Sequence, residues 1–395
     1  MALQKVTLVT TSFPVGARSV SGIFVAHLAD RLSELVELSV VTPADTTSAG
    51  RFRRRAVTVV ACRYAPERWQ YLAHAPGGIP VALRNNRWLY LWLPGMLLSL
   101  FTSSAREALS SSVIHANWAI CGCLAGVLGR MLGKPVVTTL RGEDVTRAGR
   151  STMDRLLLRT CLGLSNRVVS VSQNMRNWLA EHFNQYSDKL ALIENGVDEA
   201  FLVVGAQRNH GNPPRAIHLI TVGSLIPRKG VDQILRALAR LGGAQSTLNV
   251  VGTGPEEQSL REMATSLGLA GRVTFTGRVE PGEVPALLAE ADVFVLASHS
   301  EGRPNVVLEA MAAGLPVIAS DIPGVSEIVE HGHTGLLFDD GDMVQLARCI
   351  ETLSVDQALQ RRLGEEGRNR IVSKGLTWPN CARKYVEVYR ELLGV

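Results

Sequence analysis

Glu301 and Glu309 flank the start of a predicted helix, and their spacing is the most informative chemical feature of the chain. A buried strand is expected to end at Ser298 and a helix to begin near Pro304, because proline suits the first helical turn. Free backbone N–H groups and the positive end of the helix dipole provide a phosphate seat there. One carboxylate can accept hydrogen bonds from a ribose diol while the other reaches an attached sugar. The alternative is that both acids are solvated residues on the flanks of the helix.

A second loop offers positive charge. The segment 221–232 reads TVGSLIPRKGVD and lies between a predicted strand and a predicted helix. A cation in such a loop can neutralise a departing diphosphate. Lys229 is the only lysine between Lys189 and Lys374 in an arginine-rich chain. Its presence indicates that this position requires a compact ammonium group and not a guanidinium. An exposed turn lysine is the alternative interpretation.

Parallel sheets built from βαβ units are expected to position these loops, because short runs rich in Val, Ile and Thr alternate with helical patterns. The expected strands are 5–10, 38–42, 57–63, 113–115, 136–140, 167–171, 190–193, 218–222, 247–251, 273–276, 293–297 and 317–320. The expected helices are 24–35, 121–132, 153–162, 231–241, 256–267, 284–289, 305–313, 325–330 and 378–393.

The length of 395 residues predicts two domains. We expect an N-terminal Rossmann-like domain over 1–202, a linker over 203–215 and a C-terminal nucleotide-binding Rossmann-like domain over 216–377. The last segment, 378–395, is expected to form a helix, with a return to the N-terminal domain left open.

Charge and composition narrow the classes of function. Residues 1–200 carry 22 Arg and Lys against 14 Asp and Glu. This half therefore either binds an anionic partner or has an Arg-rich surface with no binding role. Scattered cysteines indicate buried thiols in a reducing compartment rather than a zinc site. The apolar run 88–101 is too short to span a bilayer. No signal-peptide pattern precedes the first strand, and a cytoplasmic protein is expected.

The stretch 301–317, EGRPNVVLEAMAAGLPV, resembles the E-x7-E signature of the retaining GT-B glycosyltransferases, glycosyltransferase family 4. The patterns GIFV at 22–25, RGED at 141–144 and PNV at 304–306 look most like teichuronic-acid and exopolysaccharide transferases. The resemblance implies a GT-B fold, with two Rossmann-like domains facing across a cleft. It further implies transfer of a hexosyl group with retention, from a nucleotide-diphosphate sugar to a saccharide or lipid-linked acceptor in cell-surface or exopolysaccharide biosynthesis. No cofactor and no metal are expected.

The resemblance also assigns roles to matching residues. It implies that Glu301 and Lys229 are catalytic. It implies that the donor nucleotide or diphosphate is bound by Gly22, Arg228, Val279, Gly302, Pro304, Asn305, Val306 and Glu309. The residues implied on the donor-sugar or acceptor side are His115, Asn117, Arg141 and Asp144.

The chain departs from the family pattern at three of these places. Ser224 stands where relatives usually have Arg, so Arg228 or another cation substitutes, or diphosphate stabilisation is weaker. Asn117 replaces the second of two alternating histidines, and Arg141 replaces a histidine. A satisfied core histidine is the alternative interpretation of His115.

The sequence also allows other functions. The alternatives are a non-catalytic nucleotide-sugar-binding subunit and an epimerase or phosphorylase on the same fold. An NAD oxidoreductase is disfavoured because Glu257 stands where a dinucleotide fingerprint needs its third glycine, and dispersed basic charge disfavours a nucleic-acid binder. The segments 51–55 and 84–101 mix basic and aromatic residues. They suit peripheral contact with the inner face of the plasma membrane, or form an ordinary surface loop and a buried helix.

Overall fold

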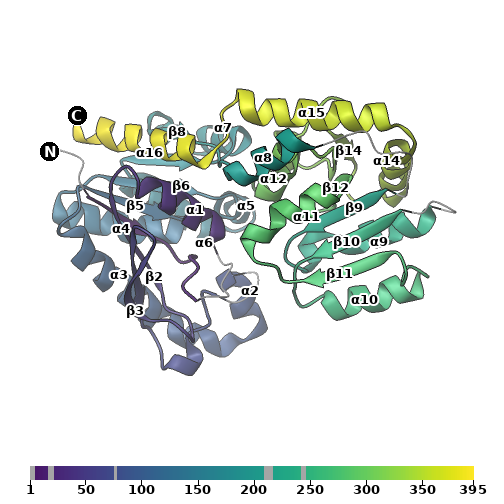
Figure 1. Ribbon diagram of the computed structural model, residues 1–395. Coiled ribbons are helices and arrows are strands. Elements are labelled where there is room, and N and C mark those ends of the chain that lie inside the picture. Colours follow the sequence, from purple (N-terminus) through teal and green to yellow (C-terminus); the bar gives the residue numbers. More distant parts are fainter. Residues whose placement is uncertain (1–4, 17–21, 75–77, 209–216, 242–245) are drawn as a thin grey trace. The chain divides into compact units, whose positions relative to one another are not determined.

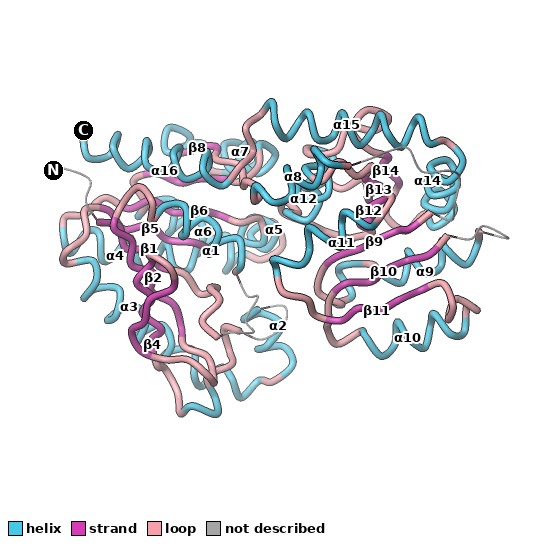
Figure 2. Tube along the Cα trace, viewed as in Figure 1, coloured by secondary structure: helices cyan, strands magenta, loops and turns pink. Residues whose placement is uncertain are grey.

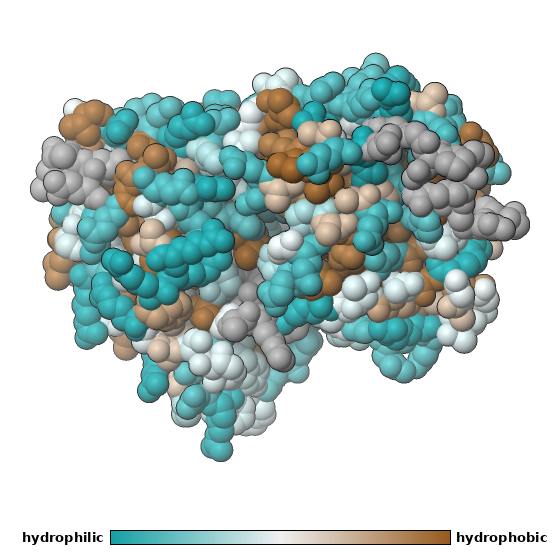
Figure 3. All heavy atoms as spheres, in the orientation of Figure 1, coloured by the Kyte–Doolittle hydropathy of each residue, from teal (hydrophilic) through white to brown (hydrophobic). Residues whose placement is uncertain are grey.

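The computed structural model describes residues 5–16, 22–74, 78–208, 217–241 and 246–395. The chain divides into two units, one made of residues 1–195 and 378–395 and the other of residues 196–377. Each unit contains its own sheet (Figures 1 and 2). The face drawn in Figure 3 is mostly hydrophilic, with hydrophobic residues in small scattered groups.

The first unit is an eight-stranded sheet of order β3-β4-β2-β1-β5-β6-β7-β8, parallel except at the β3–β4 pair. Its strands are β1 Lys5–Val9, β2 Glu37–Pro43, β3 Gly50–Arg54, β4 Val57–Cys62, β5 Val113–Asn117, β6 Val136–Leu140, β7 Arg167–Ser170 and β8 Leu190–Leu192. Its α-helices are α1 Ile23–Leu32, α2 Gly78–Asn85, α3 Leu93–Ala108, α4 Ala119–Leu132, α5 Glu143–Ala148, α6 Thr152–Leu164, α7 Gln173–His182 and the C-terminal α16 Trp378–Leu393. Short 3₁₀ helices lie at η1 Glu67–Trp69, η2 Arg87–Trp92 and η3 Asn184–Lys189.

The C-terminal helix α16 belongs to the first unit although the whole second unit separates it from β8 in sequence. Tyr385 and Tyr389 are fully buried side chains of α16 that join the core formed by α1 and the central strands. Burial of these two aromatic side chains explains why the chain returns, since aromatic residues remove more surface from water than most others.

The second unit is a six-stranded parallel sheet of order β11-β10-β9-β12-β13-β14. Its strands are β9 His218–Val222, β10 Thr247–Val251, β11 Val273–Gly277, β12 Val293–Leu296, β13 Val317–Ser320 and β14 Leu336–Phe338. Its α-helices are α8 Glu199–Gln207, α9 Val231–Arg240, α10 Glu257–Ser266, α11 Val284–Glu290, α12 Asn305–Ala312, α13 Pro323–Ser326, α14 Met343–Val355 and α15 Gln357–Ser373. The 3₁₀ helices are η4 Pro227–Lys229 and η5 Pro281–Glu283.

Successive residues of β12 show how this sheet is covered on both faces. Val293 and Val295 join a core with α9, α10 and α14, whereas Phe294 and Leu296 join a separate core with α8, α11 and α12. The two-residue period of a strand sends alternate side chains to opposite faces, and both sets are apolar here because helices cover both faces.

Strand order places the carboxyl ends of β9 and β12 side by side. Both strands start new halves of the sheet, since β10 and β11 extend it to one side of β9 and β13 and β14 to the other side of β12. Ligands of open α/β sheets bind at such a reversal of strand order. The first unit has its own reversal between β1 and β5.

The structure differs from the sequence expectations in several places. Helix α8 occupies part of the segment expected as a linker, and residues 209–216 lie outside the described part of the chain. The helix expected at 325–330 is the single turn Pro323–Ser326, and β5 runs two residues further than expected, to Asn117. The expected elements did not include the helices α2, α5, α7, α8, α14 and α15 or the strands β3 and β14.

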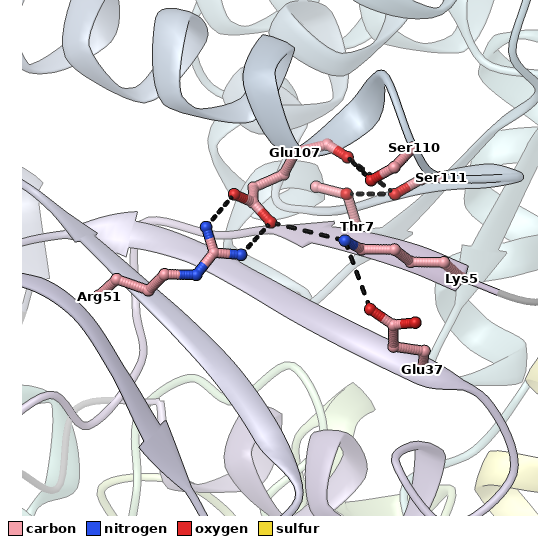
Figure 4. Close-up of polar contacts among 7 residues, drawn as sticks. All are labelled: Lys5, Thr7, Glu37, Arg51, Glu107, Ser110 and Ser111. Atoms are coloured by element: carbon pink, nitrogen blue, oxygen red, sulfur yellow. Dashed lines mark hydrogen bonds and ion pairs between the residues drawn. The ribbon is translucent and has the colours of Figure 1, made fainter.

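The basic run 51–55 is part of β3 and of a turn, and most of it is paired within the first unit. Arg51 makes two hydrogen bonds to the buried carboxylate of Glu107, at 2.8 and 3.0 Å, and Lys5 lies 3.9 Å from the same group (Figure 4). Arg54 lies 2.8 Å from Asp30. These arginines therefore hold an edge strand to helices α3 and α1 instead of forming a free basic surface.

Candidate functional site

The loops that follow β9 and β12 bring Lys229 and Glu301 together. Lys229 Nζ donates to Glu301 Oε1 at 2.5 Å, and Arg228 Nη1 lies 3.4 Å from Glu301 Oε2. Arg228 Nη1 also donates to the carbonyl oxygen of Ser300 at 2.8 Å. Two cations from one loop thus surround one carboxylate from the other, at the reversal of strand order.

A glycine allows the two loops to approach this closely. Gly230, directly after Lys229, has φ +59°, and a Cβ atom at this position would overlap the carbonyl oxygen of Ala297. Only glycine adopts this backbone region readily and leaves room for the neighbouring main chain. This close approach of the two loops brings Lys229 within hydrogen-bonding reach of Glu301.

Glu301 is held as a carboxylate. Only 7% of its side chain is exposed, and Ser298 Oγ donates to Oε1 at 2.9 Å. Burial by itself would raise the pKa of Glu301, but the charges of Lys229 and Arg228 and the hydrogen bonds from Lys229 and Ser298 outweigh it and lower the pKa below its ordinary value.

Glu309 has the opposite electrostatic environment. It lies on α12, half-buried, and none of the described residues donates a hydrogen bond to its carboxylate. Burial, with a smaller contribution from the charge of Asp198, raises the pKa of Glu309 to about 7. Two glutamates eight residues apart thus differ in protonation near neutral pH, which suits two different tasks.

The start of α12 lies where the sequence predicts it. Pro304 is the N-cap residue and makes no side-chain capping bond, and Asn305 and Val306 form the first turn. The loop before it passes close to α13, because a Cβ atom at Gly324 would overlap the carbonyl oxygen of Glu301 and contact that of Gly302. Val279, after β11, is partly buried against the core of α8, α11 and α12.

A further polar network braces the 297–301 loop, and sequence reasoning missed it. Gln233 on α9 donates from Nε2 to the carbonyl oxygen of Ala297 at 2.9 Å and to Asp340 Oδ1 at 3.0 Å. His299 Nδ1 lies 2.8 Å from the same Asp340 oxygen. Gln233 is a polar residue on the buried face of an otherwise amphipathic helix, and that position was the signal available in the sequence.

In the first unit, the four residues expected on the donor-sugar or acceptor side fall into one buried region. Arg141 donates from Nε and Nη2 to Asn117 Oδ1, at 2.9 and 2.6 Å. Asp144 Oδ1 accepts the backbone N–H of Ala119 at 2.9 Å, and Asp144 Oδ2 accepts that of Arg141 at 3.2 Å. Burial raises the pKa of Asp144 above its ordinary value.

His115 fits the core interpretation that the sequence left open. It is fully buried, with Nε2 2.9 Å from Thr139 Oγ1 and Nδ1 2.7 Å from the hydroxyl of Tyr389. Burial, and secondarily the charge of Arg141, lowers the pKa of His115 to about 3. A neutral histidine with both ring nitrogens hydrogen-bonded inside the core has a structural role. Asn117 and Arg141, not His115, form the polar cluster with Asp144.

Gly22 ends the loop between β1 and α1. It is the N-cap of α1 with φ 69°, and a Cβ atom there would overlap the carbonyl oxygen of Ser12. Residues 17–21 of the same loop lie outside the described part of the chain.

Two absences hold for the described residues. Among residues 5–16, 22–74, 78–208, 217–241 and 246–395, no three His, Cys, Asp or Glu side chains group as metal ligands would. No helix in these same ranges combines the length and apolar character that crossing a membrane requires.

Comparison with known proteins covers both units. The family model described as Glycosyltransferase Family 4 matches residues 21–201, and the one described as Glycosyl transferases group 1 matches residues 206–370. A glycogen synthase from Mycobacterium tuberculosis is 30% identical over 292 residues, which cover 70% of this chain and 68% of that protein. The N-acetyl-alpha-D-glucosaminyl L-malate synthase of Bacillus anthracis is 27% identical over 318 residues, 78% of this chain and 82% of that protein.

Solved structures agree in fold. A sucrose-phosphate synthase from Thermosynechococcus elongatus superposes with a TM-score of 0.81 at 22% identity, covering 99% of each chain. HepE from Anabaena, in complex with UDP and glucose, gives a TM-score of 0.73 at 20% identity, covering 98% of this chain and 100% of that one. The family matches, the glycogen synthase relationship and the two α/β units together assign the chain to the glycosyltransferases of family 4, transferases with the GT-B fold.

Proposed function

We propose that this glycosyltransferase moves a hexosyl group, with retention of anomeric configuration, from a nucleotide-diphosphate sugar to a saccharide or lipid-linked acceptor in cell-surface or exopolysaccharide biosynthesis. One observation carries the proposal: Lys229 and Arg228 converge on Glu301 at the strand-order reversal of the second unit, beside the start of α12. Positive side chains beside a helix N-terminus suit a diphosphate. The nucleotide ligand of HepE supports the same class of donor.

The leaving group needs positive charge. When the bond between the anomeric carbon and the diphosphate oxygen breaks, the nucleoside diphosphate keeps the electron pair and gains negative charge. Lys229 and Arg228 are placed to neutralise that charge, which is a leading contribution to catalysis of such a step. Relatives usually have an arginine at the position of Ser224, and here Arg228 supplies the second cation instead.

The acceptor completes the reaction. Its hydroxyl oxygen bonds to the anomeric carbon on the face that the diphosphate leaves, and its proton passes to an oxygen of the departing diphosphate. Electrons and protons balance without a redox partner. No cofactor is part of the proposal.

The two glutamates take different parts. Glu301 is ionised and faces the cations, so it can accept hydrogen bonds from hydroxyls of the donor sugar. Glu309 has free acceptor capacity on α12, and we assign it to the ribose diol. Gly302, Pro304, Asn305 and Val306 contribute main chain around the diphosphate, and Val279 borders the base.

Thermal unfolding of the full chain with UDP-, GDP-, ADP- and dTDP-sugars tests the donor class. One donor should raise the melting temperature of the wild type and should do so less in Lys229→Ala. Nucleoside diphosphate release that depends on an added acceptor then separates transfer from epimerase or phosphorylase activity, and NMR of the product's anomeric proton tests retention. The proposal fails if no sugar nucleotide stabilises the chain.

A specific surface supports peripheral contact with the inner face of the plasma membrane. Trp88, Leu91 and Leu98 on η2 and α3 are 76%, 70% and 63% exposed. Residues 68–106 contain four arginines, all exposed, and no acidic residue, so this segment should attract anionic headgroups. Vesicle flotation with and without anionic lipid should recover the wild type only with anionic lipid. A Trp88→Ser/Leu91→Ser protein should stay in the dense fraction, and equal recovery of both proteins would contradict the surface.

A further inference from the structure

A buried cation and two buried hydrogen-bond donors without acceptors gather beside the strand-order reversal of the first unit. They come from the carboxyl ends of β5 and β6: the Arg141 guanidinium is the cation, and the Asn117 amide and the Trp118 indole are the unpartnered donors. Phe24 of α1 ties them together, since the guanidinium carbon of Arg141 lies 5.0 Å from its ring centroid and the Trp118 ring meets it edge-on at 6.3 Å.

Arg141 is a buried cation without a carboxylate. It is 8% exposed, and its side chain donates only to neutral amide oxygens, those of Asn117 and, at 2.8 Å, Asn195. Asp144 is close enough to act on it electrostatically, but the Asp144 carboxylate accepts backbone N–H groups and none of the described acids reaches ion-pair distance of the guanidinium. A buried charge left in this way is stabilised when an anion binds it.

Two neutral donors beside it are unused. Asn117 is fully buried, and because Arg141 takes its oxygen, its Nδ2 is the atom left over; no partner accepts from it. The Nε1 of Trp118 is buried and equally unpartnered. Buried donors without acceptors are rare in folded proteins. Here two of them, Asn117 Nδ2 and Trp118 Nε1, belong to adjacent residues.

The backbone at Trp118 is strained. Trp118 has φ 76° and ψ 148°, a combination that glycine adopts readily and that is strained for a tryptophan. The surrounding fold holds it there, with the Trp118 N–H bonded to the carbonyl oxygen of Thr139 at 3.0 Å and its own carbonyl accepting from Gly122 at 2.9 Å. Strained residues of this kind cluster at active sites and ligand-binding sites, where the surrounding fold holds them in place.

We propose that Arg141, Asn117 and Trp118 form a binding site for a negatively charged group of the acceptor, a carboxylate or a phosphate. The proposal rests on the proposed transfer reaction and names its acceptor class. Every unused group in the cluster is a donor, so the ligand must bring acceptor oxygens, and the unpaired cation selects an anion. The donor diphosphate is assigned to Lys229 and Arg228 in the second unit, so the anion bound here is a different one, and we assign it to the acceptor.

Isothermal titration of the full chain with sodium glucuronate, inorganic phosphate and neutral glucose tests the site. At least one anion should bind more tightly than glucose. Arg141→Gln should weaken that binding at least about tenfold, as loss of a charge-assisted hydrogen bond implies. Trp118→Phe keeps the aromatic ring and removes one N–H, and should weaken it roughly two- to tenfold. The control Arg176→Gln, an exposed position on α7, should bind as the wild type does.

The arms of the experiment separate its possible explanations. If the anion still binds the Lys229→Ala protein and no longer binds Arg141→Gln, it occupies this site and not the diphosphate site at Lys229 and Arg228. Glucuronate binding alone indicates an acidic sugar acceptor, and phosphate binding alone indicates a phosphorylated or phosphate-linked one. Absence of any preference for anions over glucose overturns the proposal, as does unchanged binding in Arg141→Gln. If that variant does not fold, unchanged binding in Trp118→Phe overturns it instead. Failure of the transfer reaction would show separately, as absence of sugar-nucleotide binding.

Discussion

Replacing Glu309 with glutamine is expected to stabilise the second unit and to weaken donor binding. Burial, and then the charge of Asp198, raises the folded-state pKa of Glu309 from its ordinary 4.5 to about 7. An acid with a raised pKa loses its proton first in the unfolded state, so the folded state loses stability as pH rises from 4.5 to 7 and bears the full cost above that.

The shift sets the magnitude. The interval between 4.5 and about 7 corresponds to roughly 3 kcal/mol at pH 8, at about 1.4 kcal/mol for each pKa unit. Because the side chain is half-buried, water reduces this figure, and we expect a gain of about 1–3 kcal/mol for Glu309→Gln at pH 8. At pH 4.5 the gain should fall to about 0.4 kcal/mol, because the unfolded state is then half protonated, and at lower pH it should vanish because both states hold the proton.

Urea unfolding at pH 4.5 and pH 8 measures the stability change, with Glu290→Gln as an exposed control on α11. Titration of the best nucleotide from the donor screen measures binding, which should weaken about tenfold or more when a charged acceptor of the ribose hydroxyls is lost. A Glu309→Gln protein that is less stable than the wild type at pH 8 would refute the reasoning. It would mean that the carboxylate has partners that offset its burial.

Three further changes test the geometry. Lys229→Ala should reduce kcat far more than it raises the donor KM, because the ammonium acts on charge that develops as the diphosphate leaves; a pure KM effect in steady-state kinetics would contradict this. Gly230→Ala should destabilise the second unit by roughly 1–3 kcal/mol, since a Cβ atom overlaps main chain and φ is +59°, whereas Gly271→Ala, with open space around it, should be near neutral in denaturant unfolding. The first unit should lose about 1.4 kcal/mol for each pH unit below 6.5, because the folded-state pKa of His115 is lowered to about 3 and only the unfolded state takes up the proton. His115→Gln should flatten that slope between pH 4 and 6, and an unchanged slope would rule out His115 as its source.

The sequence was sufficient for the elements around the donor site. Strand β9, the loop with Lys229, strand β12 and the start of α12 near Pro304 were all predictable, because an apolar strand followed by a polar loop and a helix start is a local pattern. The antiparallel strand β3 was missed because alternating arginines do not resemble a strand core. Arg51 of β3 is hydrogen-bonded to Glu107, which lies fifty-six residues further along the chain.

The brace of Gln233, His299 and Asp340 was also beyond the sequence. Each residue alone is an ordinary polar residue, and they meet only because α9 and the loops after β12 and β14 reach the same end of the sheet. The strain at Trp118 was equally hidden, since a backbone φ angle depends on the main chain that surrounds it.

The sequence by itself determined two parallel α/β units, the loops that carry Lys229 and Glu301, and the family to which the chain belongs. Only the tertiary structure decided what each acid does. Glu301 and Glu309 are the same residue type, yet Lys229, seventy-two positions away, lowers the pKa of the first, while burial without a hydrogen-bond donor raises the pKa of the second. Protonation depends on the charges and the dielectric around a group, and folding alone brings those together.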